Sequence, residues 1–293
     1  MLKKIIWDLS LPELLTEVEK KAVRRLQEQS RSTGYDCLDI DPARARGFTE
    51  SEYTYAECLF ISGRPEYLEQ ASALGMACIG YYDPTHPSAH LAKADIVVES
   101  FVYLDVSFLE NVWKRSQGLP VTIYEGEHII LRELTVEDID SLHRICQEPL
   151  VRAYISDMKD DPALEKIKHR FYIRHIYTFY GYGLWGIFFR DPGHPGQDLL
   201  IGRCGLEQHS LLGEDQMMLS YYLDTTYWGR GLAREACLGV FAFAREELDI
   251  HRIVAVIVKD NERSLNLARS LGMHRTGDLM YENRDSYLYV IDL

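Results

Sequence analysis

The sequence has no long apolar run. Its longest apolar stretches, such as residues 253–258, are far too short to span a bilayer. Near the N-terminus, Trp7, Asp8 and Glu13 interrupt the apolar core that a secretory signal peptide needs. We therefore expect a cytoplasmic protein that has no membrane partner.

Closely spaced cysteines are also missing. The six cysteines are scattered and form no C-x-x-C pair; they are Cys37, Cys58, Cys78, Cys146, Cys204 and Cys237. A zinc site or a redox dithiol would need close spacing, and the histidines show no metal-like pairing either. We expect free, mostly buried thiols and no metal.

A basic stripe is absent as well. Residues 1–118 hold 13 Lys+Arg against 18 Asp+Glu, and the remaining residues hold 19 against 27, which together make the net charge of −13. Without a basic surface to neutralise a phosphate backbone, nucleic acid is not expected as a partner. The acidic balance favours cationic ligands such as amines, but it also serves solubility alone.

The composition is typical of a globular protein, and the length indicates two domains. It is 46% hydrophobic and 26% charged, without internal repeats or low-complexity segments. A length of 293 residues exceeds one core of ordinary size. A helical pattern stops at Gly118 and Pro120, so we predict domains at residues 1–118 and 121–293.

In the first domain, short apolar runs alternate with amphipathic segments. Ser10 and Glu13 have the spacing of a capping box, which predicts that a helix begins there. Strands are predicted at residues 5–7, 58–61, 77–81 and 96–98, and further helices at 65–74 and 108–113. This alternation is typical of an α/β domain with a small parallel, Rossmann-like sheet that has helices on both faces.

The second domain has a different order of elements. Strands are predicted at residues 128–132, 184–189, 199–206, 217–223 and 252–258 and in two closing segments, and helices at 136–146, 164–180, 232–248 and 262–271. This order predicts an α+β domain with a mixed sheet. The aromatic stretch at residues 171–185 borders a helix end and a strand, where such side chains belong to a core more often than to a pocket.

The segment Tyr227–Ala233 (YWGRGLA) follows an apolar strand and precedes a helix. Gly229 and Gly231 let backbone N–H groups approach a ligand without obstruction by a Cβ atom. The helix start adds unpaired N–H groups and the positive end of the helix dipole, and Arg230 and Arg234 add charge. This combination predicts a pyrophosphate site.

Two runs carry a resemblance to a known family. LSYYLDTTYWGRGLAREA (residues 219–236) and VKDNERSLNLARSLGM (residues 258–273) resemble the GNAT acetyltransferases, in particular the branch that contains RimJ and RimL. In that branch a Trp-Gly-[Lys/Arg]-Gly-x-Ala loop binds the CoA pyrophosphate, and Asn-x-x-Ser opens the next helix. The order of elements from His128 onward is similar too. The resemblance implies a GNAT fold and an N-acetyltransferase that uses acetyl-CoA as co-substrate.

The resemblance also implies roles for individual residues. The pyrophosphate would be held by the main chain of Trp228, Gly229, Arg230, Gly231, Leu232 and Ala233. Tyr222 and Leu223 would pair with the pantetheine amides, as an added strand does. Asn261 would bond the pantetheine arm near the thioester, in the catalytic centre, and Ser264 would support the helix start. Simple capping of that helix would also explain both residues, and the two roles can hold together.

For the reaction, the resemblance implies direct attack of a neutral amine on the thioester in a ternary complex. Two groups common among relatives are missing, since Met218 stands where many have glutamate and Ala268 where others have tyrosine. Glu207 is the best remaining general base, with Glu214 and His209 in reserve. A solvated carboxylate at Glu207 and a water chain to the base both stay open.

The sequence leaves several alternatives open for the acceptor and for the activity. A peptide α-amine, a polyamine, an amino acid or an aminoglycoside-like amine would each fit the resemblance as acceptor. Because the glutamate and the tyrosine are missing, a non-catalytic acyl-CoA-binding sensor is the alternative function. A residual phosphohydrolase in the first domain is a third.

The first domain has a weaker resemblance, to the haloacid-dehalogenase-like phosphohydrolases. IIWDLS (residues 5–10) is similar to their opening strand, and AECLFISGRPEYLEQASALGMACIGYYDP (residues 56–84) to a late part of the fold. Asp8 would fall at the nucleophile position, but Ser10 replaces the next aspartate and residues 62–65 (SGRP) replace an acidic pair. That chemistry needs several carboxylates around a magnesium ion, to hold the metal and to move a proton, and one aspartate alone cannot do both. We expect no phosphatase activity and instead ligand binding, a homodimer or positioning of the acceptor; a plain α/β interaction domain is the alternative.

Overall fold

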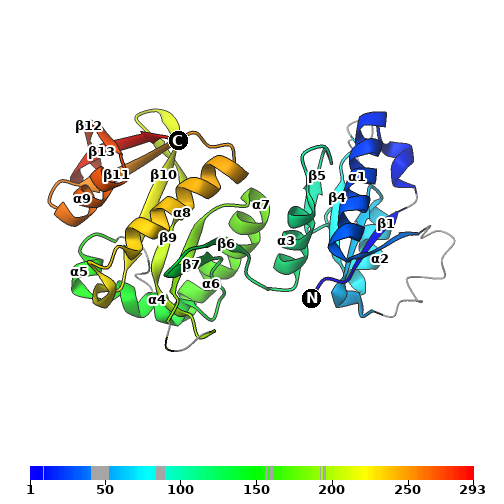
Figure 1. Ribbon diagram of the computed structural model, residues 1–293, viewed down its shortest axis with the longest axis horizontal. Coiled ribbons are helices and arrows are strands. Elements are labelled where there is room, and N and C mark those ends of the chain that lie inside the picture. Colours follow the sequence, from blue (N-terminus) through cyan, green and yellow to red (C-terminus); the bar gives the residue numbers. More distant parts are fainter. Residues whose placement is uncertain are drawn as a thin grey trace. The chain divides into compact units, whose positions relative to one another are not determined.

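The computed structural model describes residues 1–8, 10–40, 53–83, 90–155, 158, 161–191, 193 and 196–293. The chain forms two compact units, Met1–Leu119 and Pro120–Leu293. Each unit has its own sheet (Figure 1). Each also has its own core of buried apolar residues.

The first unit contains a five-stranded parallel sheet with the order β2-β1-β3-β4-β5, so the expected parallel sheet is present. Its strands are β1 (Lys4–Asp8), β2 (Asp36–Ile40), β3 (Cys58–Ser62), β4 (Ala77–Tyr81) and β5 (Ile96–Val98). Its helices are η1 (Leu11–Leu14), α1 (Glu17–Thr33), η2 (Tyr55–Glu57), α2 (Pro65–Ala73) and α3 (Val106–Ser116). The sequence did not predict β2, because this edge strand is mostly exposed and carries Asp36 and Asp39 among its five residues.

Helices cover both faces of this sheet. Apolar residues of α1 and α3, such as Leu26 and Leu109, pack with Trp7 and Ile61 in one cluster. On the other face Leu68 and Ala71 of α2 pack with Phe60. The alternating faces follow from the right-handed crossovers that connect parallel strands.

The start of the first long helix differs from the prediction. Thr16, not Ser10, caps α1, because its Oγ1 accepts the N–H of Glu19 at 3.3 Å. The Ser10 hydroxyl instead donates to Asp8 Oδ1 at 2.7 Å. The Ser10–Glu13 pattern leads into the short η1 turn, and the chain reaches α1 only after it.

The second unit contains an eight-stranded mixed sheet with the order β12-β13-β11-β10-β9-β8-β7-β6. Its strands are β6 (Thr122–Glu125), β7 (Ile129–Arg132), β8 (Leu184–Phe189), β9 (Leu199–Leu211), β10 (Glu214–Leu223), β11 (Arg252–Val258), β12 (His274–Tyr281) and β13 (Arg284–Asp292). All neighbouring strands are antiparallel except β10 and β11, which are parallel. The mixed sheet agrees with the prediction, although β9 and β10 are longer than expected.

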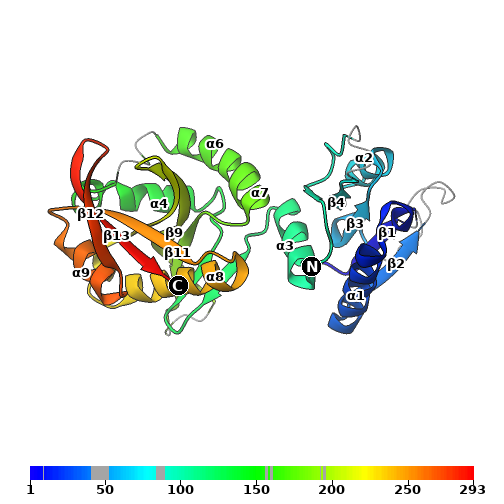
Figure 2. The same cartoon turned by 90° about the horizontal axis from the view of Figure 1, so that it is seen from above.

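Helices cover this second sheet on both faces (Figures 1 and 2). They are α4 (Ile139–Cys146), α5 (Pro149–Arg152), α6 (Pro162–Tyr172), η3 (Ile173–Tyr177), α7 (Thr178–Tyr180), η4 (Thr225–Tyr227), α8 (Leu232–Glu247) and α9 (Glu262–Ser270). α8 and α9 contribute Val240 and Leu265 to the main core. On the other face α4 packs Leu142 with Phe188 and Tyr222.

The segment η3 is a π-helix between α6 and α7. It places Tyr172 and Tyr177, five residues apart, with their rings 5.1 Å apart in an edge-to-face arrangement. Both hydroxyls bond the main chain of Leu184, since Tyr172 accepts its N–H at 2.8 Å and Tyr177 donates to its carbonyl. The wide turn therefore ties this helix to the start of β8.

Candidate active site

The central feature of the second unit is the opening between β10 and β11. Within the described strands, these parallel neighbours are joined at one register position, Met218–Val254. By contrast, β10 is paired with β9 along the whole of β10, and β11 is paired with β13 along the whole of β11. Beyond the joining pair, the two strands line a cavity of about 760 Å³. Main-chain groups on diverging strand edges need other partners, so an extended chain with amide groups suits this opening.

Several predicted site residues meet at this cavity. Its lining includes Glu207, Tyr222, Asn261 and Ser264. Among the described residues, Leu223 and the turn Trp228–Ala233 are not part of the lining, and Leu223 is buried in the main core. The turn follows the C-terminal end of β10 after the short helix η4, and β10 forms one wall of the cavity.

The glycine turn has the backbone form that the sequence predicts. Gly229 and Gly231 have φ angles of +75° and +79°, in the left-handed region that favours glycine. Within the described part of the chain, a Cβ atom at either position would meet nothing within 4 Å, so the turn opens onto free space. Gly231 is the N-cap of α8, and no described side chain caps this helix. Its first N–H groups are therefore available to an anion.

Aromatic and cationic side chains hold the turn in place. The indole Nε1 of Trp228 donates to the Leu223 carbonyl at 2.9 Å. The Arg263 guanidinium lies 4.6 Å from the centre of the Trp228 ring, and that of Arg230 lies 5.1 Å from the Tyr227 ring. The Trp228 bond fixes the turn to the end of β10, while the two arginines add positive charge beside it.

At the start of α9, three side chains form a hydrogen-bonded chain. Asn261 Oδ1 accepts the N–H of Ser264 at 3.2 Å, so the capping interpretation of this motif is correct. Tyr221, which the sequence interpretation passed over, donates its hydroxyl to Ser264 Oγ at 2.9 Å. Burial raises the pKa of Tyr221 above its usual value, which keeps the phenol protonated. Its place in the strand between Leu219 and Leu223 was the signal available in the sequence.

Glu207 faces the same cavity from β9. It lies opposite Met218 in the antiparallel register, and opposite residues point to the same side of a sheet. The carboxylate therefore lies one strand away from the missing glutamate position. Tyr172 donates to Glu207 Oε1 at 3.5 Å, and His209 Nε2 lies 3.9 Å from Oε2. Burial, followed by the charge of Glu207, raises the pKa of Tyr172.

The acetyltransferase (GNAT) domain family matches residues 128–274, half of the chain. The chain belongs to this family. The match covers the opened strands, the glycine turn and the start of α9, and it confirms the expected enzyme class, an N-acetyltransferase.

Individual GNAT proteins are similar over the same share of the chain. The uncharacterized N-acetyltransferase YoaA of Bacillus subtilis is 28% identical over 175 residues, which cover 56% of this chain and 92% of YoaA. The uncharacterized N-acetyltransferase p20 of Bacillus licheniformis is 27% identical over 173 residues, 53% of this chain and 84% of p20. The solved structure of RimL, a ribosomal L7/L12 alpha-N-protein acetyltransferase in complex with coenzyme A, has a TM-score of 0.50 at 16% identity and covers 59% of this chain and 98% of its own. That likeness concerns the fold.

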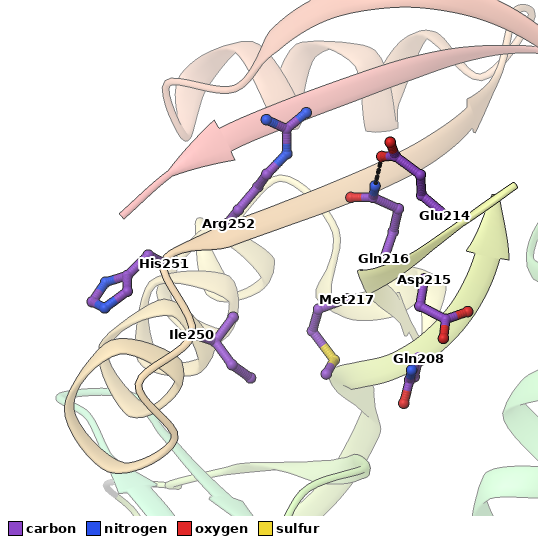
Figure 3. A pocket seen from close by; sticks show the side chains of 8 residues that line it. All are labelled: Gln208, Glu214, Asp215, Gln216, Met217, Ile250, His251 and Arg252. Atoms are coloured by element: carbon purple, nitrogen blue, oxygen red, sulfur yellow. Dashed lines mark hydrogen bonds between the residues drawn. The ribbon is translucent and has the colours of Figure 1, made fainter. Parts of the chain in front are cut away.

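Of the two reserve bases in the GNAT domain, Glu214 lies elsewhere. It lines a separate hollow of about 550 Å³ where β10 and β11 begin, together with Gln216 and Arg252. Its carboxylate accepts a hydrogen bond from the Gln216 side-chain amide (Figure 3), and the distance from Nε2 to Oε2 is 3.0 Å. His209 does line the main cavity, where its Nδ1 lies 3.4 Å from the Tyr281 hydroxyl.

The aromatic stretch at residues 171–185 is divided between the GNAT core, which holds Tyr177 and Trp185, and the surface, where Phe171, Phe179 and Tyr180 are exposed. Trp185 is fully buried and packs edge-on against Phe243, with 5.2 Å between the two ring centres. The six cysteines are free thiols and five are buried, as expected. Among the described residues, no group of three or more His, Cys, Asp or Glu side chains could hold a metal ion. No helix within the described ranges is both long enough and apolar enough to cross a membrane.

Proposed function

We propose that this GNAT domain transfers the acetyl group of acetyl-CoA to a primary amine, of a peptide N-terminus or a small molecule, by direct attack in a ternary complex. The observation that carries the proposal is the opening of β10 from β11 beyond the Met218–Val254 pair, next to an uncapped, glycine-led helix start. An extended pantetheine arm fits the opened strand edges, and a pyrophosphate fits the N–H groups of the turn.

In this proposal the turn from Trp228 to Ala233 holds the pyrophosphate through its main chain. Tyr222 and Leu223 pair with the pantetheine amides. Because the Leu223 carbonyl already accepts the Trp228 indole, only its second lone pair is left for the cofactor. Asn261 uses its Oδ1 to cap α9, so its amide N–H groups serve the arm near the thioester.

The amine has to lose a proton before it attacks. At pH 7 this costs roughly 1.4 kcal/mol for an α-amine of pKa near 8, but more than ~4 kcal/mol for a lysine-like amine. Glu207 is the proposed base, because it lines the cavity and has His209 and Tyr172 as neighbours. The amine lone pair then forms the new C–N bond at the thioester carbon, whose oxygen a main-chain N–H of β10 near Tyr222 polarises.

The departing sulfur needs a proton when the C–S bond breaks. Tyr221 and Ser264 supply two hydroxyls in the cavity wall, on the same side as Ala268, where many relatives carry a tyrosine. The Tyr221 proton points to Ser264 Oγ, which leaves the Ser264 proton for the sulfur. We propose this hydroxyl pair as the proton source for CoA release.

Calorimetric titration of the full chain with acetyl-CoA, with CoA and ADP as controls, tests the donor. Micromolar binding, about −8 kcal/mol, supports the proposal. Free CoA released with an amine then separates an enzyme from a non-catalytic acyl-CoA sensor. Failure to bind at millimolar acetyl-CoA overturns the cofactor assignment.

The base has a matched control within the chain. Glu207→Gln is expected to lower kcat/KM by about 10²-fold or more for a lysine-like amine, and less for an α-amine of lower pKa. Glu214→Gln removes a carboxylate of the separate hollow and is expected to leave kcat/KM unchanged. Equal rates in the two variants would refute Glu207 as the base.

For the first unit we propose a non-catalytic role, as a binding, dimerising or acceptor-positioning domain. Asp8, at the end of β1, is 1% exposed and accepts bonds from the hydroxyls of Ser10 and Ser62, each at 2.7 Å. Arg64 Nε donates to the Ser10 hydroxyl at 2.8 Å. A carboxylate engaged in this way is poorly placed to attack a phosphate. The likeness to haloacid-dehalogenase-like proteins and the cytoplasmic location stay predictions.

A further inference from the structure

The cavity between β10 and β11 differs in charge from the unit around it. Among the residues that the structure describes, the charged ones that line it are Arg152, Arg203, Arg284, Glu207 and Glu282, together with His209. Arginines therefore outnumber carboxylates here, whereas residues 119–293 hold 19 Lys+Arg against 27 Asp+Glu. Cations gathered in an acidic protein create a local positive potential that selects anions.

Two of the arginines belong to neighbouring segments of the cavity lining. Arg284 is the first residue of β13, and its Nη1 donates to the Ala153 carbonyl at 2.6 Å. Ala153 directly follows Arg152, the last residue of α5. The Arg284 guanidinium lies 5.1 Å from the centre of the Tyr154 ring. Arg284 Nη2 also lies 3.6 Å from Oδ1 of Asp260, whose side chain is 73% exposed.

Within the described part of the chain, Arg152 bonds an uncharged partner. Its guanidinium donates to the side-chain oxygen of Gln147, a neutral amide. Within the described ranges, the α5 side of the cavity thus carries two guanidinium groups, and the carboxylate that pairs with Arg284 there, Asp260, is well hydrated. An incoming anion can replace water around Asp260 and Arg284 without breaking a buried ion pair.

The proposed base comes from a different element. Glu207 lies on β9, whereas Arg152 ends α5 and Arg284 begins β13. The third arginine, Arg203, is on the same face of β9 as Glu207, and its guanidinium lies 5.2 Å from the centre of the Tyr222 ring. The carboxylate that receives the amine and the two guanidinium groups that receive the anion are therefore contributed by different elements of one cavity.

We propose that the acceptor is a primary amine that also carries a carboxylate, which Arg284 and Arg152 bind while the amine faces Glu207. This inference rests on the proposed acetyl transfer. Charge-assisted bonds from guanidinium to carboxylate give the recognition its strength and its geometry. Polyamines and aminoglycoside-like polycations are disfavoured, because they would bring further positive charge beside three arginines.

A panel of acceptors tests the preference. Acetylation is measured for the peptide amides Ala-Asp-Ala, Ala-Asn-Ala and Ala-Lys-Ala, for free alanine against alaninamide, and for spermidine. The peptide arm and the amino-acid arm distinguish a side-chain carboxylate from an α-carboxylate. In at least one arm, kcat/KM is expected to be at least tenfold higher for the carboxylate than for its neutral counterpart. Equal kcat/KM across both arms, or a preference for spermidine, overturns the proposal.

Arginine variants test the residues. In Arg284→Gln and Arg152→Gln the ratio of acidic to neutral kcat/KM is expected to fall below about threefold, and Arg284→Lys is expected to restore part of it. Arg252→Gln, in the separate hollow, serves as the control and keeps the ratio. A preference that survives in the double variant overturns the assignment. The assignment is also overturned if the variants raise only the KM for acetyl-CoA, because the arginines would then bind the cofactor and not the acceptor. Because acetyl-CoA binding is titrated separately, failure of the acetyl transfer itself is recognised as such.

Discussion

Replacing Gly231 with alanine separates the anion site from general stability. Gly231 has a φ angle of +79° and is the N-cap of α8. A new Cβ atom would meet no described atom within 4 Å, so it creates no clash in the free protein. The cost there is backbone strain alone, about 1–2 kcal/mol for an L-residue in the left-handed region.

The effect on acetyl-CoA is expected to be larger. If the backbone relaxes to a negative φ, the N–H groups at the start of α8 turn away from the pyrophosphate. A hydrogen bond to a charged group contributes about 1.5–3 kcal/mol, so two lost donors cost about 3–6 kcal/mol. At 1.4 kcal/mol for each factor of ten, the Kd for acetyl-CoA rises about 100-fold to 10,000-fold.

Gly213→Ala is the matched control. Gly213 lies in the turn between β9 and β10 with a φ angle of +86°, and a Cβ atom there also meets nothing within 4 Å. Urea unfolding is expected to show similar losses for both variants, while calorimetry shows weakened acetyl-CoA binding for Gly231→Ala alone. If Gly231→Ala binds acetyl-CoA within threefold of the parent, or if Gly213→Ala is weakened equally, the pyrophosphate assignment is wrong.

Three further predictions concern single side chains. Burial lowers the pKa of His169 below its usual 6.5, although its bond to the Leu134 carbonyl opposes the shift. Below about pH 6.5 the unfolded chain then binds more protons than the folded one, so the free energy of unfolding falls as the pH drops. His169→Gln should reduce this dependence of the free energy of unfolding on pH, measured by urea unfolding between pH 5 and 8. Thr16→Ala should lower the free energy of unfolding by about 1 kcal/mol, because it removes the cap of α1, and an unchanged unfolding midpoint would contradict this. Tyr221→Phe should lower kcat about 10²-fold with little change in KM for acetyl-CoA, and a parent-like kcat in a steady-state assay would exclude the hydroxyl pair as proton source.

Local pattern was sufficient for most elements of the second unit. The helices α8 and α9 and the strand β11 occur where their periodicities predict them. Two local predictions were less successful in the first unit. The edge strand β2 has little apolar periodicity, and the Ser10–Glu13 spacing marked a short turn rather than α1. Both depend on neighbours: β2 forms by pairing with β1, and Ser10 is held by Asp8 and Arg64.

The sequence by itself determined the glycine turn, its position between a strand and a helix, and the Asn-x-x-Ser helix start, because these depend on residues a few positions apart. Only the tertiary structure decided which side chains share a cavity. Glu207 is placed opposite Met218 by strand register, and Tyr221 meets Ser264 across 43 positions of the chain. Arg284 reaches Ala153 across 131 positions. Such long-range contacts depend on the order of the strands in the sheet and on the divergence of β10 from β11. Both result from packing of the whole unit, so no periodic pattern in the sequence indicates them.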